Sequence, residues 1–492
     1  MPPLVAAGGE FTNLAELISA HADVRPDDIA VVEPRPVRRT MTWGELDAQV
    51  DALAAGFAAH GLVAGHRVGI LGPNSIEFVL AYFAALRAGY VVVPINPLLT
   101  VTEVQQIVAD SGLRVLLTAA DQRFDGVHHV ALTAAGLAPL AAADAAPVSS
   151  PKDREALAVL LYTAGTSGEP KAAMLTHRAL LSHLAQVAPF GVLSAETVVL
   201  AMLPLFHVFG LNAVLGGWAL AGARLVIMDG MDGLFDVVAA EQVTNVPLAP
   251  AVLTKIITDE RCRDLAKTVT MIISGAAPLA ADLRAEFTAR TGLPIEQGYG
   301  LTEAAPGVSV TFGAADHANE HGHVGRPLPG VEVRIGDGTD EAEPGEIWIR
   351  GPNLFSGYWP DGHGGPDEDG WFATGDIGYL SDGELFLVDR ARELIIVNGF
   401  NVYPAEVEEA IGELPEVDAV AVVGRADPRA GEQVAAFVTG RVTAAMIIEH
   451  CQGRLAKFKR PTVVRVVDEL PRGATGKVRK GYLRQVLSEL ED

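Results

Sequence analysis

Residues 157–171 read Leu157-Ala158-Val159-Leu160-Leu161-Tyr162-Thr163-Ala164-Gly165-Thr166-Ser167-Gly168-Glu169-Pro170-Lys171 and join an apolar run to a loop of small, hydroxylated and basic residues. The run 157–162 is short, apolar and ends at small residues, which is typical of a buried strand. The loop offers backbone N–H groups freed by glycine, side-chain hydroxyls and one ammonium group, and these can hold a polyphosphate. Its spacing is not that of the Walker A motif, and alone such a loop more often forms a surface turn.

Strand and helix patterns alternate in the chain before this loop. Residues 42–45 (Thr-Trp-Gly-Glu) have capping-box spacing and precede apolar residues that recur on one helical face. Two runs rich in β-branched residues, 67–71 and 91–95, flank a helical pattern over 76–88. Strands that alternate with helices predict parallel α/β layers.

The rest of the chain divides by composition. The chain has 492 residues, which exceeds the size of one ordinary core. Residues 134–153 are rich in Ala, Pro and Ser and suit an exposed connection. Residues 325–389 are dense in Gly, Pro and short β-like segments. We therefore expect an α/β plus α+β protein. Its predicted parts are an N-terminal region 1–389 of layered α/β subdomains, with a β-rich subdomain at about 314–389, and a small α+β domain 390–492.

Bulk composition excludes several classes of protein. The net charge of −24 argues against a nucleic-acid or anionic-membrane binder, because such partners need a basic face. With only two cysteines there is no disulfide framework, and no signal peptide is evident at the amino terminus, so a cytoplasmic location is expected. The apolar stretch 198–228 is interrupted by Pro, His, Gly, Asn and Arg, which favours buried strand, loop and helix over a membrane span.

Three further motifs follow the loop in order. They are Gly-Tyr-Gly-Leu-Thr-Glu at 298–303, Thr-Gly-Asp at 374–376 and Gly-Ala-Thr-Gly-Lys at 473–477. With these motifs, the chain from about residue 12 to 485 resembles the acyl-adenylate-forming (AMP-binding) superfamily, and within it the fatty-acid-CoA and 4-coumarate-CoA ligases. The resemblance implies that ATP and a carboxylic acid form an acyl-adenylate, with Mg²⁺ as cofactor, and that coenzyme A then accepts the acyl group.

The same resemblance implies a role for each matching residue. The expected ATP- and AMP-binding residues are Thr163, Thr166, Ser167, Gly168 and Lys171 at the phosphates, Gly275, Ala276 and Ala277 beside adenine, Gln297, Gly298, Tyr299, Gly300 and Thr302 at the adenylate, and Asp376, Arg390 and Lys477. Glu303 would be the Mg²⁺ ligand, because this cation takes one carboxylate together with substrate phosphates. His207 would lie beside the substrate carboxylate. Lys477 would stand between the carboxylate and the α-phosphate, where a cation stabilises the meeting of two anions.

A second half-reaction requires a rearranged site, and the resemblance implies rotation of the C-terminal domain about a hinge. The hinge position falls on Arg392, where the family usually has Asp or Lys. Asn398 and Gly399 would then approach coenzyme A. Coumarate-type ligases carry lysines at the positions of Ile396 and Asn398, so this chain departs from them at that loop.

The acyl pocket is expected to be apolar. By analogy with the coumarate ligases it would comprise Phe209, Ala213, Gly275, Gly300, Pro306 and Gly307. The segment between His207 and Arg224 contains no acidic residue that could pair with the amine of an α-amino acid. A hydrophobic acid, fatty or aryl, is expected, with a lean toward a fatty acid because Phe209 offers no hydroxyl for a phenol.

Alternatives from other classes stay open at this point. The chain could be an acyl-AMP ligase that loads an acyl carrier protein, or a light-emitting oxygenase. A non-catalytic nucleotide-binding module is disfavoured because Glu303 and Lys477 are both present. The expected partners are small molecules, with neither nucleic acid nor stable membrane insertion, while a homodimer and a carrier protein stay open.

Overall fold

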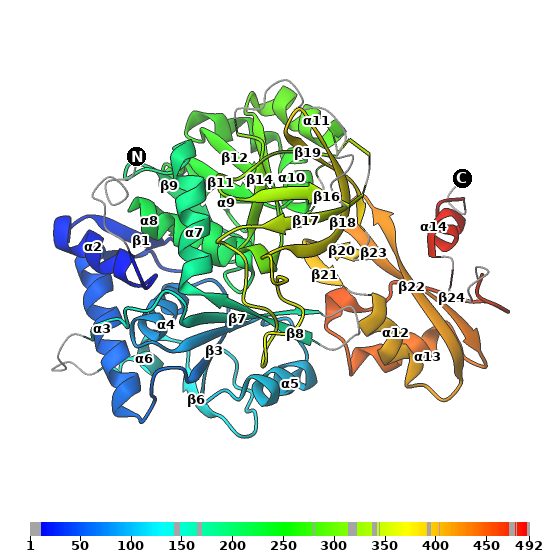
Figure 1. The fold of residues 1–492 in the computed structure, drawn as a ribbon, viewed down its shortest axis with the longest axis horizontal. Helices are drawn as coiled ribbons and strands as arrows, with labels where there is room; N and C mark the ends of the chain where they lie inside the picture. The colour runs from blue at the N-terminus through cyan, green and yellow to red at the C-terminus, as the bar shows by residue number, and fades with distance from the viewer. Residues whose placement is uncertain are drawn as a thin grey trace.

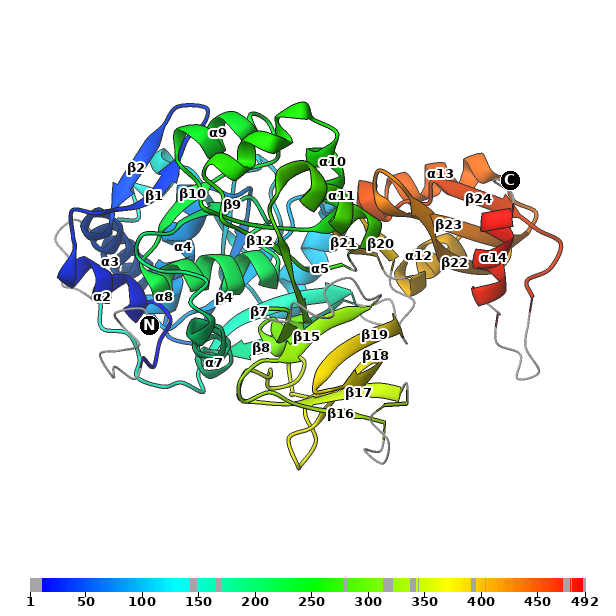
Figure 2. The same ribbon diagram turned by 90° about the horizontal axis from the view of Figure 1, so that it is seen from above.

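The computed structural model describes residues 11–141, 148–164, 170–277, 279, 281–312, 322–336, 342–343, 345–390, 395–402, 404–471, 478 and 480–489. Figure 1 shows a large body formed by the chain from blue to yellow, and a smaller orange and red region beside it. In the view turned by 90°, the same C-terminal region again lies at one side of the body (Figure 2). The separation into a large and a small part agrees with the predicted fold class.

A sheet near the amino terminus is mostly parallel. Its strand order is β6 (His128–Ala131), β5 (Val115–Thr118), β3 (Arg67–Leu71), β4 (Val91–Ile95), β7 (Leu157–Ala164) and β8 (Pro170–Thr176). All neighbouring pairs are parallel except β7 and β8, which pair antiparallel. The predicted strand at 157–162 is therefore β7, and the phosphate-type loop joins it to β8.

The helix predicted after Thr42 is confirmed with its cap. Helix α3 (Trp43–Ala59) begins with a complete capping box, in which the Thr42 hydroxyl accepts from the Glu45 N–H and the Glu45 carboxylate accepts from the Thr42 N–H. This arrangement satisfies two backbone donors that helix formation leaves free. Helix α4 (Ile76–Arg87) follows β3 as predicted and is buried over its whole length. It therefore contributes to the main core rather than to the surface.

A longer path of paired strands forms the rest of the body. Its order is β16 (Glu332–Ile335), β17 (Gly345–Arg350), β18 (Phe372–Ser381), β19 (Glu384–Arg390), β15 (His323–Pro327), β14 (Gly307–Val310), β13 (Ile295–Gly300), β12 (Met271–Ser274), β11 (Asn245–Leu248), β9 (Val198–Ala201), β10 (Arg224–Ile227), β1 (Ile29–Glu33) and β2 (Arg39–Thr42). Strands β9 to β13 are parallel, and β14 to β19 pair antiparallel. Strands β15 to β19 continue the larger sheet, because β14 pairs with both β13 and β15. A separate β-rich subdomain at about 314–389 stays a prediction.

Helices cover these sheets and connect their strands. The remaining helices of the body are α2 (Glu16–Val24), α5 (Val101–Ser111), α6 (Ala134–Leu137), α7 (His177–Val187), the π-helix η2 (Phe209–Gly216), α8 (Gly217–Ala221), α9 (Leu234–Ala240), α10 (Pro250–Ile257) and α11 (Ala281–Thr291), with short 3-10 turns η1 (Ala188–Phe190), η3 (Glu260–Lys267) and η4 (Thr302–Ala304). The stretch 198–228 is strand, π-helix, helix and strand, as its interrupted composition predicted. Among the described residues, no helix combines the length and apolarity needed to cross a membrane.

The C-terminal region has hydrophobic cores of its own. Its sheet has the order β21 (Phe400–Val402), β20 (Ile395–Val397), β23 (Gly431–Gly440) and β22 (Val417–Asp427), with β24 (Val463–Val466) on β23, and its helices are α12 (Pro404–Gly412), α13 (Ala444–Gln452), η5 (Lys457–Lys459) and α14 (Lys480–Glu489). Apolar side chains pack on both faces of this sheet and form two clusters. The domain boundary at 389/390 stays a prediction, since residues 391–394 lie outside the described part.

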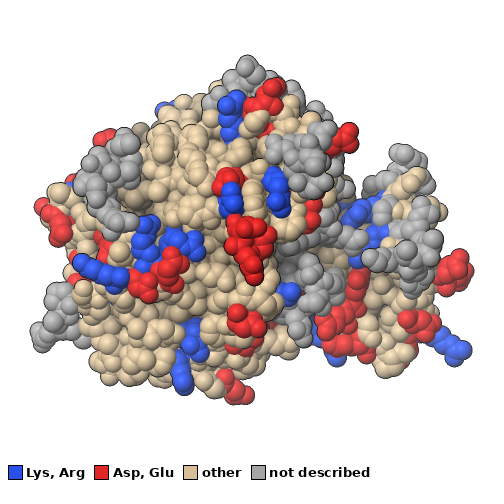
Figure 3. Space-filling model, viewed as in Figure 1, with Lys and Arg blue, Asp and Glu red and all other residues tan. Residues whose placement is uncertain are grey.

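Described charged side chains of both signs are interspersed on one face of the molecule (Figure 3). On the face in Figure 3, acidic and basic side chains alternate in small groups. A mixed surface of this kind gives a polyanion no extended patch to bind on that face.

Candidate active site

A cavity of about 220 Å³ gathers residues from segments that are far apart in sequence. Its wall includes Gly275 and Ala276, which directly follow β12, together with residues of β13 and β18. The carboxyl ends of parallel strands are the usual ligand sites of α/β sheets. The predicted residues that line it are Thr163, His207, Phe209, Ala213, Gly275, Ala276, Gly298, Tyr299, Gly300, Thr302, Glu303, Pro306, Gly307 and Asp376. The structure therefore brings most of the predicted nucleotide and acyl residues to one place.

Other predicted residues lie outside the cavity wall or outside the described chain. Lys171, Ala277, Gln297, Asn398 and Gly399 are described but do not line the cavity. The backbone of Arg390 pairs with Asp376 across β18 and β19, and its side chain lies outside what the structure describes. Predictions for Thr166, Ser167, Gly168, Arg392 and Lys477 also fall outside the described residues.

The ends of the predicted phosphate loop face each other across a hairpin. Thr163 on β7 pairs with Lys171 on β8, and the Thr163 hydroxyl donates to the Lys171 carbonyl oxygen at 3.3 Å. The Lys171 ammonium lies 5.5 Å from the centre of the Tyr358 ring, at cation–π distance. The hairpin thus holds the cation of the loop near the cavity, next to an aromatic ring that contacts the predicted metal ligand.

Glu303 is held in place by a tyrosine that the sequence analysis did not identify. Glu303 is 5% exposed on the short turn η4, and Tyr358 Oη donates to its Oε1 at 2.5 Å. A carboxylate that accepts such a bond keeps lone pairs for a hard cation, and Mg²⁺ needs one or two carboxylates when substrate phosphates supply the rest. Among the described residues, no group of three or more His, Cys, Asp or Glu side chains is arranged so that it could hold a metal ion. The single carboxylate of Glu303 fits a cation whose other ligands come from substrate phosphates.

Tyr299 and Asp376 are joined directly. Tyr299 Oη donates to Asp376 Oδ2 at 2.7 Å, which links β13 to β18 at the polar end of the cavity. Gln297, two residues earlier, is buried, and its Nε2 donates to the His323 carbonyl oxygen at 3.4 Å. The Tyr299 ring and the predicted nucleotide-binding carboxylate of Asp376 are consequently fixed relative to each other before any ligand binds.

His207 lies in the cavity wall as a neutral ring. Burial lowers its pKa to about 4. Its Nδ1 accepts from the Phe209 backbone N–H at 3.2 Å, so the proton of the neutral imidazole is on Nε2. The ring can therefore donate one hydrogen bond into the cavity without carrying charge.

Small residues let the backbone form the wall between the two ends of the cavity. A Cβ atom at Gly275 would lie 2.9 Å from Phe209 Cε1, and one at Gly300 would lie 2.0 Å from the Pro306 carbonyl oxygen. Ala276 has a φ of +67°, a left-handed conformation that side chains with a Cβ rarely adopt. Such strain is commonly found at ligand sites, which agrees with the predicted position of Ala276 beside the nucleotide.

The acyl half of the cavity is longer than the sequence analysis predicted. Additional apolar wall residues are Leu184, Val187, Leu193, Val199, Val214, Leu220, Pro247, Ile273, Val310 and Phe312. Polar residues that were not predicted also line the cavity, namely His183, Asn245, Ser309 and Thr374. His183 lies in the run 177–187, where two histidines six positions apart in an apolar helix were the available signal.

The predicted coenzyme A loop is an Asn-Gly β-hairpin. Asn398 and Gly399 have φ values of +50° and +82°, the combination that a tight turn between two strands favours. The adjacent Phe400 ring lies parallel to Phe206, with centroids 6.4 Å apart and 9° between the planes. The turn is thereby held against the segment that carries His207, although it does not line the cavity.

Comparisons with known proteins agree with this geometry. The family model described as AMP-binding enzyme matches residues 18–359, and that of the AMP-binding enzyme C-terminal domain matches residues 406–477. Indoleacetate–CoA ligase of Aromatoleum aromaticum is 35% identical and is matched over 96% of this chain and 98% of its own. A long-chain-fatty-acid–CoA ligase of Mycobacterium tuberculosis is 33% identical over 97% and 99%. The structure of o-succinylbenzoate CoA synthetase from Bacillus subtilis superposes with a TM-score of 0.85, at 28% identity over 95% and 98% of the chains.

The fold, the cavity and these matches define an adenylate-forming enzyme. This chain belongs to the AMP-binding enzyme family. It is an acid–thiol ligase of the AMP-forming class, in agreement with the prediction from its motifs.

Proposed function

We propose that this enzyme activates a hydrophobic carboxylic acid with ATP and transfers the acyl group to coenzyme A. The observation that carries the proposal is a single cavity with two chemically different ends. Asp376, Tyr299 and Glu303 supply polar groups at one end, and apolar residues of α7, η2 and β14 surround the other. A cavity of this kind can hold a nucleotide phosphate and an acyl chain in contact.

In the first step a substrate carboxylate oxygen would attack the α-phosphorus of ATP, and the bond to pyrophosphate would break. The neutral His207 can donate Nε2–H to a carboxylate oxygen and so orient it for attack. Lys477 stays the predicted cation between the two anions. Tyr299 and Asp376 would hold the adenosine part, because their mutual hydrogen bond fixes both groups in advance.

Glu303 is the proposed protein ligand for Mg²⁺, and Lys171 would neutralise phosphate charge beside it. The cation, when bound with ATP, would supply charge neutralisation at the phosphates. The position of Glu303 supports this role, because it is buried in the cavity wall and Tyr358 orients its carboxylate.

In the second step the thiol sulfur would attack the acyl carbonyl carbon. The bond from that carbon to the AMP oxygen would break, AMP would leave, and the thiol proton would be released to solvent. The docked Asn398–Gly399 turn supports a site for the thiol carrier next to His207, since Phe400 packs on Phe206. This contact supports the proposal that the Asn398–Gly399 turn lies against the body during thioester formation.

Separate observations support the proposed acyl acceptor and the proposed acid substrate. Coenzyme A is favoured because the matched relatives are named as CoA ligases. The acid is proposed to be fatty or aryl, since the relatives include an indoleacetate ligase and a long-chain-fatty-acid ligase, and the acyl half of the cavity is mostly apolar.

The test is acid-dependent exchange between pyrophosphate and ATP over short, medium, long and aromatic acids, followed by thioester formation with free coenzyme A. We expect exchange and CoA thioester with at least one class of hydrophobic acid. Exchange without CoA thioester, together with loading of an acyl carrier protein, would favour the carrier alternative. Absence of exchange with every acid would contradict the proposal.

A further inference from the structure

His183 is one of the few polar side chains in the mostly apolar acyl half of the cavity. The residue belongs to α7, is 3% exposed and lines the cavity. Its Nε2 and Cδ2 atoms would lie 2.7 Å and 2.8 Å from a Cβ atom built on Gly307. The ring edge therefore faces the same part of the cavity as Gly307, one of the predicted acyl-pocket residues.

Neighbouring groups determine which ring nitrogen of His183 carries the proton. Asn212 Nδ2 lies 3.3 Å from His183 Nδ1 and donates to the carbonyl oxygens of Leu180 at 3.1 Å and Ala305 at 2.7 Å. Two carbonyl acceptors fix the amide with its NH₂ group toward the ring, and an N–H on Nδ1 would point at that NH₂ group. The proton of neutral His183 is therefore on Nε2, the nitrogen beside Gly307.

The imidazole is neutral and has apolar surroundings. Burial lowers the pKa of His183 to about 3. Leu184, Val187 and Val214 are among the wall residues on the neighbouring turns of α7 and η2. Among the described residues of the wall, Glu303 and Asp376 carry the acidic charges, and both lie at the proposed nucleotide end. His183 thus presents a single uncharged N–H donor to the acyl group.

We propose that His183 is a specificity-determining residue that selects acids with a hydrogen-bond acceptor on the acyl body. The inference rests on the proposed function. An ether, carbonyl or hydroxyl oxygen of the acyl group would accept the Nε2–H bond. An all-carbon acid of the same shape would displace solvent from this N–H without replacing its bond, and a buried donor left unpaired is unfavourable. The acid is therefore a hydrophobic one that carries oxygen away from its carboxylate.

The test uses two acids that differ only at the acceptor, built on the skeleton that the exchange screen ranks best. For an aryl skeleton the pair is 4-methoxycinnamic and 4-ethylcinnamic acid, and for an alkyl skeleton it is a chain ether and its methylene analogue. The measured quantity is the ratio of kcat/KM for the two acids in pyrophosphate exchange. We expect the wild type to favour the oxygen-bearing acid by about tenfold.

Variants then separate recognition from structure. In His183→Phe the ratio should fall to within about twofold of one, and in His183→Gln, which keeps an N–H donor, it should return toward the wild-type value. His177→Asn is the matched control, because His177 is also buried on α7 but is bonded to the Leu14 N–H and Asn13 rather than facing the cavity. It should lower the unfolding temperature and leave the ratio unchanged.

The outcomes distinguish this inference from the proposed function. Absence of exchange with every acid in the wild type would overturn the proposed function itself. Normal exchange with a wild-type ratio near one, or a ratio that His183→Phe does not change, would overturn only the assignment of His183. Because the wild-type ratio is decisive alone, the inference stays testable even if His183→Phe does not fold.

Discussion

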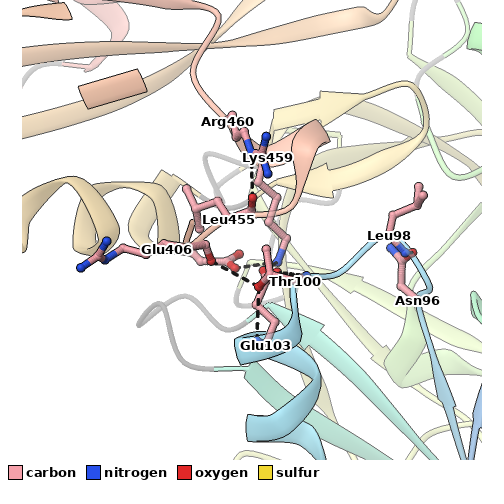
Figure 4. Close-up of polar contacts among 9 residues, drawn as sticks. Asn96, Leu98, Thr100, Glu103, Glu406, Leu455, Lys459 and Arg460 are labelled. Atoms are coloured by element: carbon pink, nitrogen blue, oxygen red, sulfur yellow. Dashed lines mark hydrogen bonds and ion pairs between the residues drawn. The ribbon is translucent and has the colours of Figure 1, made fainter. Parts of the chain in front are cut away.

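Lys459 donates a hydrogen bond of 2.8 Å from its Nζ to Glu103 Oε1, across the contact between the C-terminal region and the body (Figure 4). Lys459 ends the turn η5, and Glu103 is in the first turn of α5. The same ammonium donates to Glu406 Oε1 of α12 at 2.6 Å, and the three side chains are at most 11% exposed. One cation thus bridges two buried carboxylates from different parts of the chain.

Removing this cation is expected to weaken the docked position of the C-terminal region. Breaking a buried ion pair by deleting one partner costs about 3–5 kcal/mol, because the other charge stays buried. In Lys459→Met, thioester formation from a supplied acyl-adenylate should therefore slow by roughly tenfold or more, while pyrophosphate exchange should change much less. Rapid-quench measurement of the two half-reactions tests this. Equal losses in both would mean that the bridge does not act on docking.

The docked arrangement should also depend on pH through Glu406. Burial raises the pKa of Glu406 to about 7, although Lys459 acts in the opposite direction. Burial acts to raise the pKa of Glu103 as well, yet Lys459 and Thr100 hold it below its ordinary value. Below about pH 7 the site therefore contains one carboxylate and one ammonium, and above it a second, uncompensated carboxylate charge.

Because the docked state holds the Glu406 proton more tightly than an exposed carboxylate does, docking should be strongest at acid pH and weaken as pH rises through about 7. Fluorescence energy transfer between one label on the body and one on the C-terminal region, measured from pH 5.5 to 8.5, reports the docked fraction. Glu406→Gln should remove the pH dependence. A transfer efficiency that is flat in the wild type would contradict the expectation.

Tyr358 should affect the use of Mg²⁺ through Glu303. Its hydroxyl donates to Glu303 Oε1 at 2.5 Å, and hydrogen bonds to charged groups contribute about 1.5–3 kcal/mol. Tyr358→Phe should therefore raise the Mg²⁺ concentration for half-maximal exchange by roughly tenfold. Calorimetry would measure the affinity for Mg²⁺ and ATP independently of enzyme activity. Tyr379→Phe, a tyrosine of β18 that stacks on Phe386, is the control and should behave as wild type.

Patterns in the sequence predicted individual helices and strands. They did not predict contacts between residues that are far apart in the sequence. The cap at Thr42 and the order of β3, α4 and β4 follow from residues within one turn or one strand, so they could be predicted. The partners of Glu303 and Glu103 are 55 and 356 positions away. Such contacts depend on how sheets and domains pack, and the periodicity of one segment does not indicate which distant segment it contacts.

The candidate site was predicted through motifs rather than through physics alone. Glycines and hydroxyls around Thr163 suggested a phosphate site, but only the ordered motifs gave Tyr299 and Asp376 their roles, and the structure brings these two into contact. His183 carries no motif, and its function depends on the approach of Gly307 from a strand 124 positions further along the chain, a separation that follows from the residue numbers. Polar residues of a pocket wall are therefore the part that sequence reasoning finds last.

Lys477 lies outside the described residues, and its role stays a prediction. Lys477→Ala should lower adenylate formation by at least a hundredfold, roughly the range for removal of one transition-state electrostatic contact. Transfer from a supplied acyl-adenylate should fall far less, since the predicted cation acts only in the first step. Lys480→Ala is the matched control, because Lys480 forms an ion pair with Glu408 at 2.8 Å and should leave both half-reactions near wild type. Equal loss of both half-reactions in Lys477→Ala would contradict the two-site scheme.

Substitutions at Gly399 test where the thiol reaches the site. Comparison of two variants separates the effect of backbone strain from that of side-chain size. At a φ of +82° any side chain costs about 1–2 kcal/mol in backbone energy, and Gly399→Ala adds only a Cβ atom 3.6 Å from the Ala249 Cβ. Gly399→Trp shares that strain and adds a ring beside the segment that carries His207. We expect Gly399→Trp to abolish CoA thioester formation and Gly399→Ala to slow it only a fewfold, with pyrophosphate exchange much less affected in both. Normal CoA turnover in Gly399→Trp would place the thiol path elsewhere.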